Sequence, residues 1–265
     1  MNTIQAILIA IIEGLTEFLP ISSTAHMVIT SAFMKIEGDA FTKYFEICIQ
    51  FGAILSVVVL YFKKFINFKN PAFYLKLIIA IIPSLILGFL LNDFIDANLE
   101  NPLFIAIIMM LGGVILLFVD KWFNHPIITD ENDIDHKLAL KIGLFQCLSI
   151  IFPGLSRSAS TIIGGMSQKL SREAAAEFSF FLAVPTMFAA TSYKTLKYVK
   201  EFGGFSMDQL TTLLIGNVVA FVVALLAIKF FINFLKQKGF KLFGYYRIIL
   251  GAIVLICIAT GIIDK

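Results

Sequence analysis

The chain has 265 residues, of which 59% are hydrophobic and 15% are charged, and its formal net charge at pH 7 is +3. Soluble domains are roughly 45–50% apolar and about 25% charged, so this composition excludes an ordinary soluble domain. The charges gather in short stretches that separate apolar runs of about 20 residues, the length that crosses a bilayer core. We therefore predict an all-α integral membrane protein, and we see no pattern typical of a nucleic-acid-binding protein.

The first apolar segment, residues 3–34, is interrupted near its middle by Pro20 and by two serines, Ser22 and Ser23. Each half has only about 12–16 residues, which is too short to span a bilayer. A pair of short helices around a proline break predicts a re-entrant hairpin, which membranes tolerate only where it lines a cavity. The N-terminus lacks a basic region and a small-residue cleavage site, so we expect no cleavable signal peptide.

Six uninterrupted apolar runs follow, and they show no strand-like alternation, so we predict transmembrane helices. These runs are residues 44–62, 72–91, 102–119, 175–193, 209–234 and 246–263. A polar, acidic loop over about 121–136 divides them into two groups of three. It is followed by a second broken segment, residues 138–166, with Pro153 and Gly154 at its break. The three cysteines have no metal-ligand spacing, and we interpret them as inert packing thiols.

The two halves of the chain are related by a weak internal repeat. An offset of 133 residues places residues 13–20 on residues 146–153 and Phe45 on Phe178. Each copy, about 1–120 and 134–263, then holds one re-entrant hairpin and three spans within a single membrane domain, 1–265. Because three is an odd number, the copies must lie in opposite orientations, as in inverted-topology repeats.

Lysine and arginine mark the cytoplasmic ends of membrane helices, so they predict the orientation. The residues expected inside are Lys63, Lys64, Lys69, Lys169, Arg172, Lys236, Lys238, Lys241 and Arg247. The acidic loop with Asp93, Asp96 and Glu100 and both termini are expected outside, and three lysines (Lys194, Lys197 and Lys200) would lie outside against the rule. The two hairpins would enter from opposite sides and meet near the midplane.

Glu13 and Glu17 are four residues apart on an apolar helix, so they share one face. Two carboxylates inside a membrane are costly and are functional by default. They indicate a divalent cation site, or one protonated acid beside an ionised partner. The alternative is a pair satisfied by hydrogen bonds within the helix bundle.

His26 lies three and four residues after the serines of the first break, so a helix that restarts after Pro20 would bring these side chains together. This arrangement suits a general acid or base. A histidine that caps or bridges helices is the alternative. Further along, Glu46 and Gln50 on the next span could extend the site, and some of the 28 phenylalanines could line a path for an apolar tail.

The second break is the most specific stretch of the chain. Gly154 permits a close backbone approach, and the N–H groups of a restarting helix attract anions. Ser156, Ser158 and Thr161 add hydroxyl groups, and Arg157 supplies a planar fork that fits a phosphate. At this depth Arg157 needs a counter-charge, which could be the glutamates or a bound phosphate. The alternative is a structural arginine–glutamate pair.

The two breaks also carry a resemblance to a known family. Residues 13–26, EGLTEFLPISSTAH, resemble the EGxTEFLPxSSTxH motif of the bacitracin-resistance-type undecaprenyl-diphosphate phosphatases, and residues 153–161 match that family's PGxSRSxxT motif. The resemblance covers nearly the whole chain in length, motif order and spacing. Ala25, where relatives often have glycine, is the departure within the motifs.

The resemblance implies an enzyme that hydrolyses undecaprenyl diphosphate to undecaprenyl phosphate and inorganic phosphate. It would recycle the lipid carrier for peptidoglycan and other envelope polysaccharides, and it would confer bacitracin resistance. The resemblance also implies a multi-pass protein of the bacterial plasma membrane, and we expect its active site to open to the outside. With the residue chemistry above, it yields these assignments: catalytic Glu17, Ser23, His26 and Arg157; substrate-binding Ser22, Gly154, Ser156, Arg157, Ser158 and Thr161; and metal-binding Glu13 and Glu17. The expected cofactor is Mg²⁺ or Ca²⁺, and the expected partners are a polyprenyl diphosphate, membrane lipid and a second copy of the chain in a homodimer.

Two other classes of protein share parts of this pattern. Inverted repeats with broken helices are also the architecture of transporters and lipid flippases, which would release no phosphate. An intramembrane protease fits less well, because the chain shows neither a catalytic aspartate pair nor a GxSG-type serine.

Overall fold

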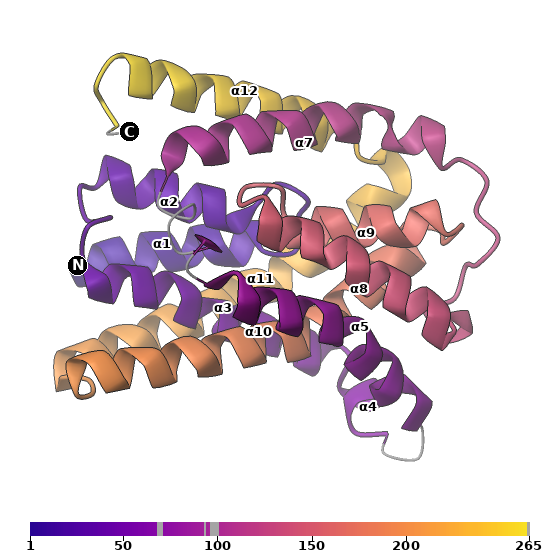
Figure 1. Ribbon diagram of the computed structural model, residues 1–265, viewed down its shortest axis with the longest axis horizontal. Coiled ribbons are helices and arrows are strands. Elements are labelled where there is room, and N and C mark those ends of the chain that lie inside the picture. The colour runs from indigo at the N-terminus through magenta and orange to yellow at the C-terminus, as the bar shows by residue number, and fades with distance from the viewer. Residues whose placement is uncertain (68–70, 93, 96–100, 264–265) are drawn as a thin grey trace.

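The computed structural model describes residues 1–67, 71–92, 94–95 and 101–263, and helices make up most of this part of the chain (Figure 1). Six helices are long and apolar enough to cross a membrane, which confirms the predicted all-α membrane fold. They are α3 (Ala40–Leu60), α5 (Pro71–Leu90), α7 (Pro102–Trp122), α10 (Arg172–Phe202), α11 (Met207–Lys238) and α12 (Lys241–Ala259). Their order is the predicted one, but α10 continues nine residues beyond the predicted end at residue 193. The three lysines expected in an outside loop therefore lie on helix.

Both segments with predicted breaks consist of two separate helices. The first contains α1 (Thr3–Thr16) and α2 (Ser23–Phe33), and the second contains α8 (His136–Ile151) and α9 (Arg157–Ser167). Figure 1 shows α1 and α2 toward one end of the molecule and α8 and α9 toward the other, with the breaks turned to the middle. A hydrogen bond from Ser158 Oγ to the carbonyl oxygen of Phe18, 3.1 Å long, joins the two breaks directly.

The second helix of each broken segment begins in the same unusual way. Ser22 caps α2 and Ser156 caps α9, and their φ angles are +69° and +78°. In each case the serine Oγ accepts a hydrogen bond from the backbone N–H three residues later. Proline favours a break because it lacks the N–H group that a helix interior uses, and the serine cap then begins the next helix. The sequence signals for the breaks therefore act locally.

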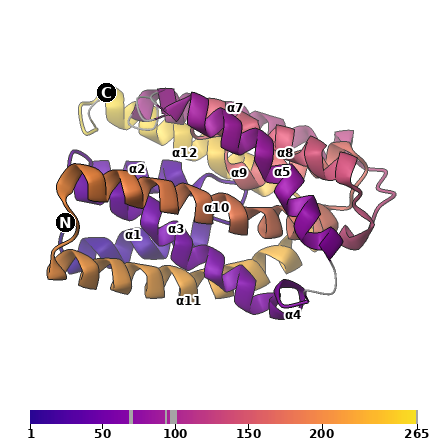
Figure 2. The same ribbon diagram turned by 60° about the horizontal axis from the view of Figure 1, so that its bottom comes forward.

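The helices pack in pairs that correspond to one another between the two halves of the chain. Helix α1 packs against α11 and α8 packs against α5, while α7 and α12 lie side by side (Figure 2). If α8 is the counterpart of α1 and α11 the counterpart of α5, the α1–α11 contact and the α8–α5 contact are equivalent. Any two-fold repeat gives this pattern, so both the repeat and the opposite membrane orientation of its halves stay predictions.

Glycines allow the closest of these approaches. A Cβ atom at Gly143 of α8 would strike the backbone of Ala80 in α5, and one at Gly52 of α3 would strike the backbone of Asn217 in α11. Small residues at such crossings let membrane helices approach closely and gain van der Waals contact. The position of the second broken segment therefore depends on a glycine contact with α5.

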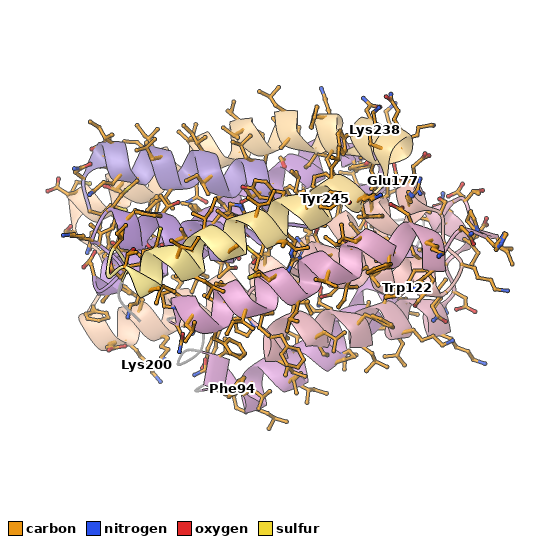
Figure 3. The ribbon with its side chains drawn as sticks, turned by 90° about the horizontal axis from the view of Figure 1, so that it is seen from above. Phe94, Trp122, Glu177, Lys200, Lys238 and Tyr245 are labelled. Atoms are coloured by element: carbon orange, nitrogen blue, oxygen red, sulfur yellow. The ribbon has the colours of Figure 1, made fainter. Side chains whose placement is uncertain are left out.

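Charged residues lie at both ends of the molecule, whereas Arg247 is buried, and the orientation of the two ends across the membrane stays a prediction. Figure 3 shows Lys238 and Trp122 at one end of the molecule and Lys200 at the other, and Figure 1 places both termini at the latter end. The predicted loop residues Lys69, Asp93, Asp96 and Glu100 lie outside the described residues. The prediction of Arg247 as an inside loop cation is wrong: the residue lies within α12 and is completely buried.

The short helix α4 (Phe62–Phe65) and the 3₁₀ turn η1 (Glu131–Asp133) lie at the end opposite the termini. The acidic loop over 121–136 is anchored there, because Glu131 pairs with Lys64 and Ile128 bridges to Leu170.

Candidate active site

Glu17 connects the two breaks. It follows α1, is buried, and uses both carboxylate oxygens. Its Oε2 accepts a 2.6 Å hydrogen bond from Ser23 Oγ, and its Oε1 accepts one of 2.7 Å from Arg157 Nη2. Ser23 and Arg157 are the first residues of α2 and α9, each directly after its serine cap. Glu17 therefore binds equivalent positions of the two broken segments.

Glu13 lies one turn before Glu17 and beside it, and its side chain is completely buried. Among the described residues, neither of its carboxylate oxygens has a hydrogen-bond partner. Buried polar groups normally have partners, so this carboxylate, with Glu17 and Ser23 beside it, fits a bound cation. No group of three or more histidine, cysteine or acidic side chains gathers as a metal site within the described part of the chain. The two glutamates are thus the protein groups that could hold a cation here.

Arg157 is held on its other side by α10. Its Nη1 donates to the carbonyl oxygen of Ser179 at 2.9 Å and is 3.4 Å from the Ser179 hydroxyl. That hydroxyl also lies 2.6 Å from Thr161 Oγ1. In the described structure the Nε of Arg157 is buried without a partner. The guanidinium is therefore fixed in direction, and its Nε–H is not used by any of the described residues.

A cavity of about 160 Å³ lies between the breaks. Its polar lining consists of Glu17, Ser22, Ser23, Thr24, Gln50, Gln146, Ser149, Ser156, Arg157 and Thr186. A second cavity of about 470 Å³ shares Thr24 and Gln50 with it and extends to Lys194, Lys197 and Glu201 on α10. Because Lys200 lies at the end that carries the termini, the larger cavity leads from the site toward that end.

The arrangement is a buried polar site with one guanidinium, two carboxylates and several hydroxyls inside a helical membrane protein. Residues 6–253 match the model of the family described as bacitracin resistance protein BacA. The chain belongs to this BacA family. The resemblance stated from the two motifs is thereby confirmed.

Curated relatives of this BacA-family protein share most of its length. An undecaprenyl-diphosphatase of Flavobacterium johnsoniae is 60% identical over 97% of this chain and 96% of its own. One from Porphyromonas gingivalis is 51% identical over 99% of both chains. One from Aquifex aeolicus is 44% identical over 96% of this chain and 97% of its own.

The predicted phosphate ligands of this BacA protein divide into two groups. Ser22, Ser156 and Arg157 line the smaller cavity, and their role as phosphate ligands stays a prediction. Gly154, Ser158 and Thr161 do not line it, because each is engaged in structure. Gly154 has a φ of +95° and lies against the backbone of Ile105, where a Cβ would be 2.7 Å from the carbonyl oxygen. Ser158 binds the first break and Thr161 binds α10, so these three hold the breaks in place.

The structure does not bring His26 to the smaller cavity. Its Nδ1 is 2.7 Å from the carbonyl oxygen of Ser22, and its Nε2 is 2.8 Å from the hydroxyl of Tyr246 on α12. A carbonyl can only accept, so Nδ1 carries a proton and a neutral ring accepts from Tyr246 at Nε2. The two rings are also stacked, with planes 2° apart. This is the geometry of a histidine that bridges helices, the alternative considered for His26.

Ser179 and Gln146 are site residues that the motifs did not identify. The 133-residue offset places Glu46 on Ser179 and Glu13 on Gln146, so both stand where the other half carries a glutamate. Gln146 is buried and donates to Ser84 Oγ at 2.5 Å. Extending the repeat alignment to polar residues alone would have found both positions.

Proposed function

We propose that this BacA-family protein hydrolyses undecaprenyl diphosphate to undecaprenyl phosphate and inorganic phosphate. The observation that carries the proposal is the Ser23–Glu17–Arg157 connection across the two breaks, beside a polar cavity inside a multi-pass membrane protein. Relatives over nearly the full chain have the name undecaprenyl-diphosphatase. The product is the lipid carrier of peptidoglycan and other envelope polysaccharides, and its recycling in the bacterial plasma membrane confers bacitracin resistance.

Phosphate binding is assigned to Arg157 with the hydroxyls of Ser22 and Ser156. The partnerless Nε of Arg157 and the N-terminal end of α9 both favour an anion at the cavity. Arg157 cannot move far, because Glu17 and Ser179 hold its two terminal nitrogens. Fixed donors of this kind stabilise charge that develops on a transferring phosphoryl group.

Ser23 is the proposed nucleophile and Glu17 its base. The 2.6 Å hydrogen bond from Ser23 Oγ to Glu17 supports this assignment, because a base must lie within reach of the proton that it removes. Ser23 Oγ forms a bond to the terminal phosphorus, its proton passes to Glu17, and the bond from that phosphorus to the bridging oxygen breaks. Undecaprenyl phosphate leaves, and water then releases phosphate from the serine. A water molecule that attacks directly is the alternative.

A divalent cation, Mg²⁺ or Ca²⁺, is proposed at Glu13 and Glu17. The orphaned oxygens of Glu13 beside a second carboxylate fit such an ion. Mg²⁺ is commonly bound by one or two carboxylates together with substrate phosphates and water. When bound, the ion would neutralise charge on the phosphate oxygens.

The active site is proposed to open to the external side of the membrane. The larger cavity leads to the end that carries both termini, and the lysine distribution predicts that this end lies outside. A diphosphate in the outer leaflet would reach the smaller cavity past Thr24 and Gln50.

The test is release of inorganic phosphate from undecaprenyl diphosphate by the purified protein in detergent micelles, with and without a chelator. We expect release that chelation abolishes and added Mg²⁺ or Ca²⁺ restores. Arg157→Ala should lower kcat at least about 100-fold, or about 2.7 kcal/mol, as for the loss of one fixed electrostatic donor. Arg172→Ala, which breaks the peripheral pair with Asp120, is the control. A transporter or flippase would release no phosphate, and full activity of Arg157→Ala would overturn the site.

A further inference from the structure

Arg247 makes four hydrogen bonds, all to backbone carbonyl oxygens. Its Nε donates to Met109 of α7 at 3.0 Å. Its Nη1 donates to Pro20 at 3.1 Å and to Leu155 at 2.8 Å, and its Nη2 donates to Gly154 at 2.9 Å. Three of the four acceptors therefore belong to the two breaks, so one side chain from α12 ties both breaks together.

These carbonyls need a donor of this kind. Pro20, Gly154 and Leu155 lie beyond the C-terminal ends of α1 and α8, outside the helical hydrogen bonds and near the negative end of each helix dipole. Inside a membrane no bulk water can satisfy them. Among the described residues no carboxylate pairs with Arg247, so the carbonyl dipoles are its compensation. A fully buried arginine of this kind is costly unless its donors are used.

The surrounding packing also leaves room for this side chain. Gly112 of α7 faces the guanidinium, and a Cβ atom there would come within 2.8 Å of Arg247 Cζ. The neighbouring Gly113 lies against the backbone of Gly244 in α12. Two consecutive glycines thus form the slot through which Arg247 reaches the breaks.

The held carbonyls are close in sequence to the reacting groups. Pro20 is two residues before the Ser22 cap and three before Ser23. Leu155 is one residue before the Ser156 cap and two before Arg157. Fixing these carbonyls fixes where α2 and α9 begin. The distance between Ser23 and Arg157, which Glu17 spans, is thereby set from α12.

We propose that Arg247 is a positioning residue that holds the two helix breaks in register, so that Arg157 meets the phosphoryl group at which Ser23 is aimed. The proposal rests on the proposed phosphatase function. Arg247 acts through the breaks and does not line the smaller cavity. Its loss should therefore affect the rate of the chemical step more than substrate binding.

The experiment compares Arg247→Met and Arg247→Lys with the parent by kcat, KM and unfolding temperature. We expect Arg247→Met to lower kcat about 100-fold, as a misplacement of about 1 Å can, with KM changed less than about threefold. Arg247→Lys keeps the charge without the planar fork, so its kcat should fall between those of the parent and Arg247→Met. Arg172→Met and Arg172→Lys are the controls at a peripheral ion pair.

A double-mutant cycle with Arg157→Ala distinguishes positioning from general loss of structure. If Arg247 acts by placing Arg157, its substitution in the Arg157→Ala background should lower kcat less than about threefold further, because coupled residues are not additive. Equal fold losses in both backgrounds would overturn the proposal, as would a folded Arg247 variant with parental kcat. If Arg247→Met does not fold, Arg247→Lys decides by the same criteria. A parent that releases no phosphate would refute the proposed function itself, which is a different outcome.

Discussion

At the scale of single residues, the site depends on how each buried charge is compensated. Glu17 receives hydrogen bonds from residues 6 and 140 positions away in the chain. A structural arginine–glutamate pair would explain that contact alone. It would not explain why Arg157 Nε and both oxygens of Glu13 remain without partners among the described residues. Arg157 and Glu13 are both neighbours of Glu17, which favours a site built for a ligand with both a cation and phosphate oxygens.

Substitution of Ser23 tests the choice of nucleophile. If Ser23 Oγ attacks phosphorus, Ser23→Ala should lower kcat by about 10³-fold or more, since loss of a nucleophile is among the largest single effects in enzymes. Acid quenching of the parent during turnover should also trap phosphate on Ser23, detectable by mass spectrometry. Ser56→Ala on α3, whose hydroxyl bonds only the carbonyl of Ala53, is the matched control. Near-normal turnover of Ser23→Ala would assign the attack to water.

At the scale of helices, the two broken segments are variations on one local structure. Both use a serine cap with positive φ, and the next residue, Ser23 or Arg157, binds Glu17. The second break has one residue more than the first. Gly154 and Leu155 stand between its proline and its serine cap, whereas Ile21 alone stands there in the first break. Gly154 accommodates the extra residue with its positive φ, which glycine adopts without strain. One local design thus presents a hydroxyl in one half and a guanidinium in the other.

The contact between α5 and α8 should limit both stability and activity. Gly143→Val would drive a side chain into the backbone of Ala80, which cannot yield as a flexible side chain could. Overpacking of this kind costs about 1–3 kcal/mol, so the unfolding temperature in detergent should fall. Phosphate release should fall with it, because α8 carries the second break. Gly88→Val on α5, with open space at its Cβ, is the control, and equal unfolding temperatures for the two variants would contradict the prediction.

At the scale of the whole molecule, the two ends differ in what they carry: ion pairs close one end, and the other is hollowed by a cavity. The end opposite the termini is held by the Arg172–Asp120 pair at 2.7 Å, by the Lys64–Glu131 pair and by the hydrogen bond of Lys76 to the carbonyl of Asn132. The other end carries both termini and the wider cavity (Figure 1). This asymmetry suits an enzyme that receives substrate from one side of the membrane.

Single cysteines at the two ends test the orientation. In a background without the three native cysteines, Asp208→Cys lies at the end with the termini and His125→Cys at the opposite end, and both positions are exposed. We expect a membrane-impermeant maleimide to label Asp208→Cys in right-side-out vesicles, and His125→Cys only after permeabilisation. The reverse pattern would invert the molecule and with it the proposed external opening of the active site.

Features that depend on local chemistry were predictable from the amino-acid sequence. The length of the apolar runs decided the membrane class and the six spans, and the prolines and serines located both breaks. The sequence also indicates that Arg157 needs a counter-charge, either from the glutamates or from a bound phosphate. In the structure this counter-charge is Glu17. These features follow from short-range rules on helix length, capping and the cost of charge in lipid.

Features that depend on contacts between distant segments were not predictable from the sequence and required the folded chain. His26 faces Tyr246, 220 residues away in the chain, instead of the cavity. Arg247 looks like a loop cation in the sequence, because the lone arginine near the start of an apolar run is typical of a membrane boundary. The carbonyls that make its burial possible come from breaks 227 and 92 residues distant. Backbone acceptors leave no side-chain signal in a sequence, so the contact of Arg247 with both breaks became visible only in the fold.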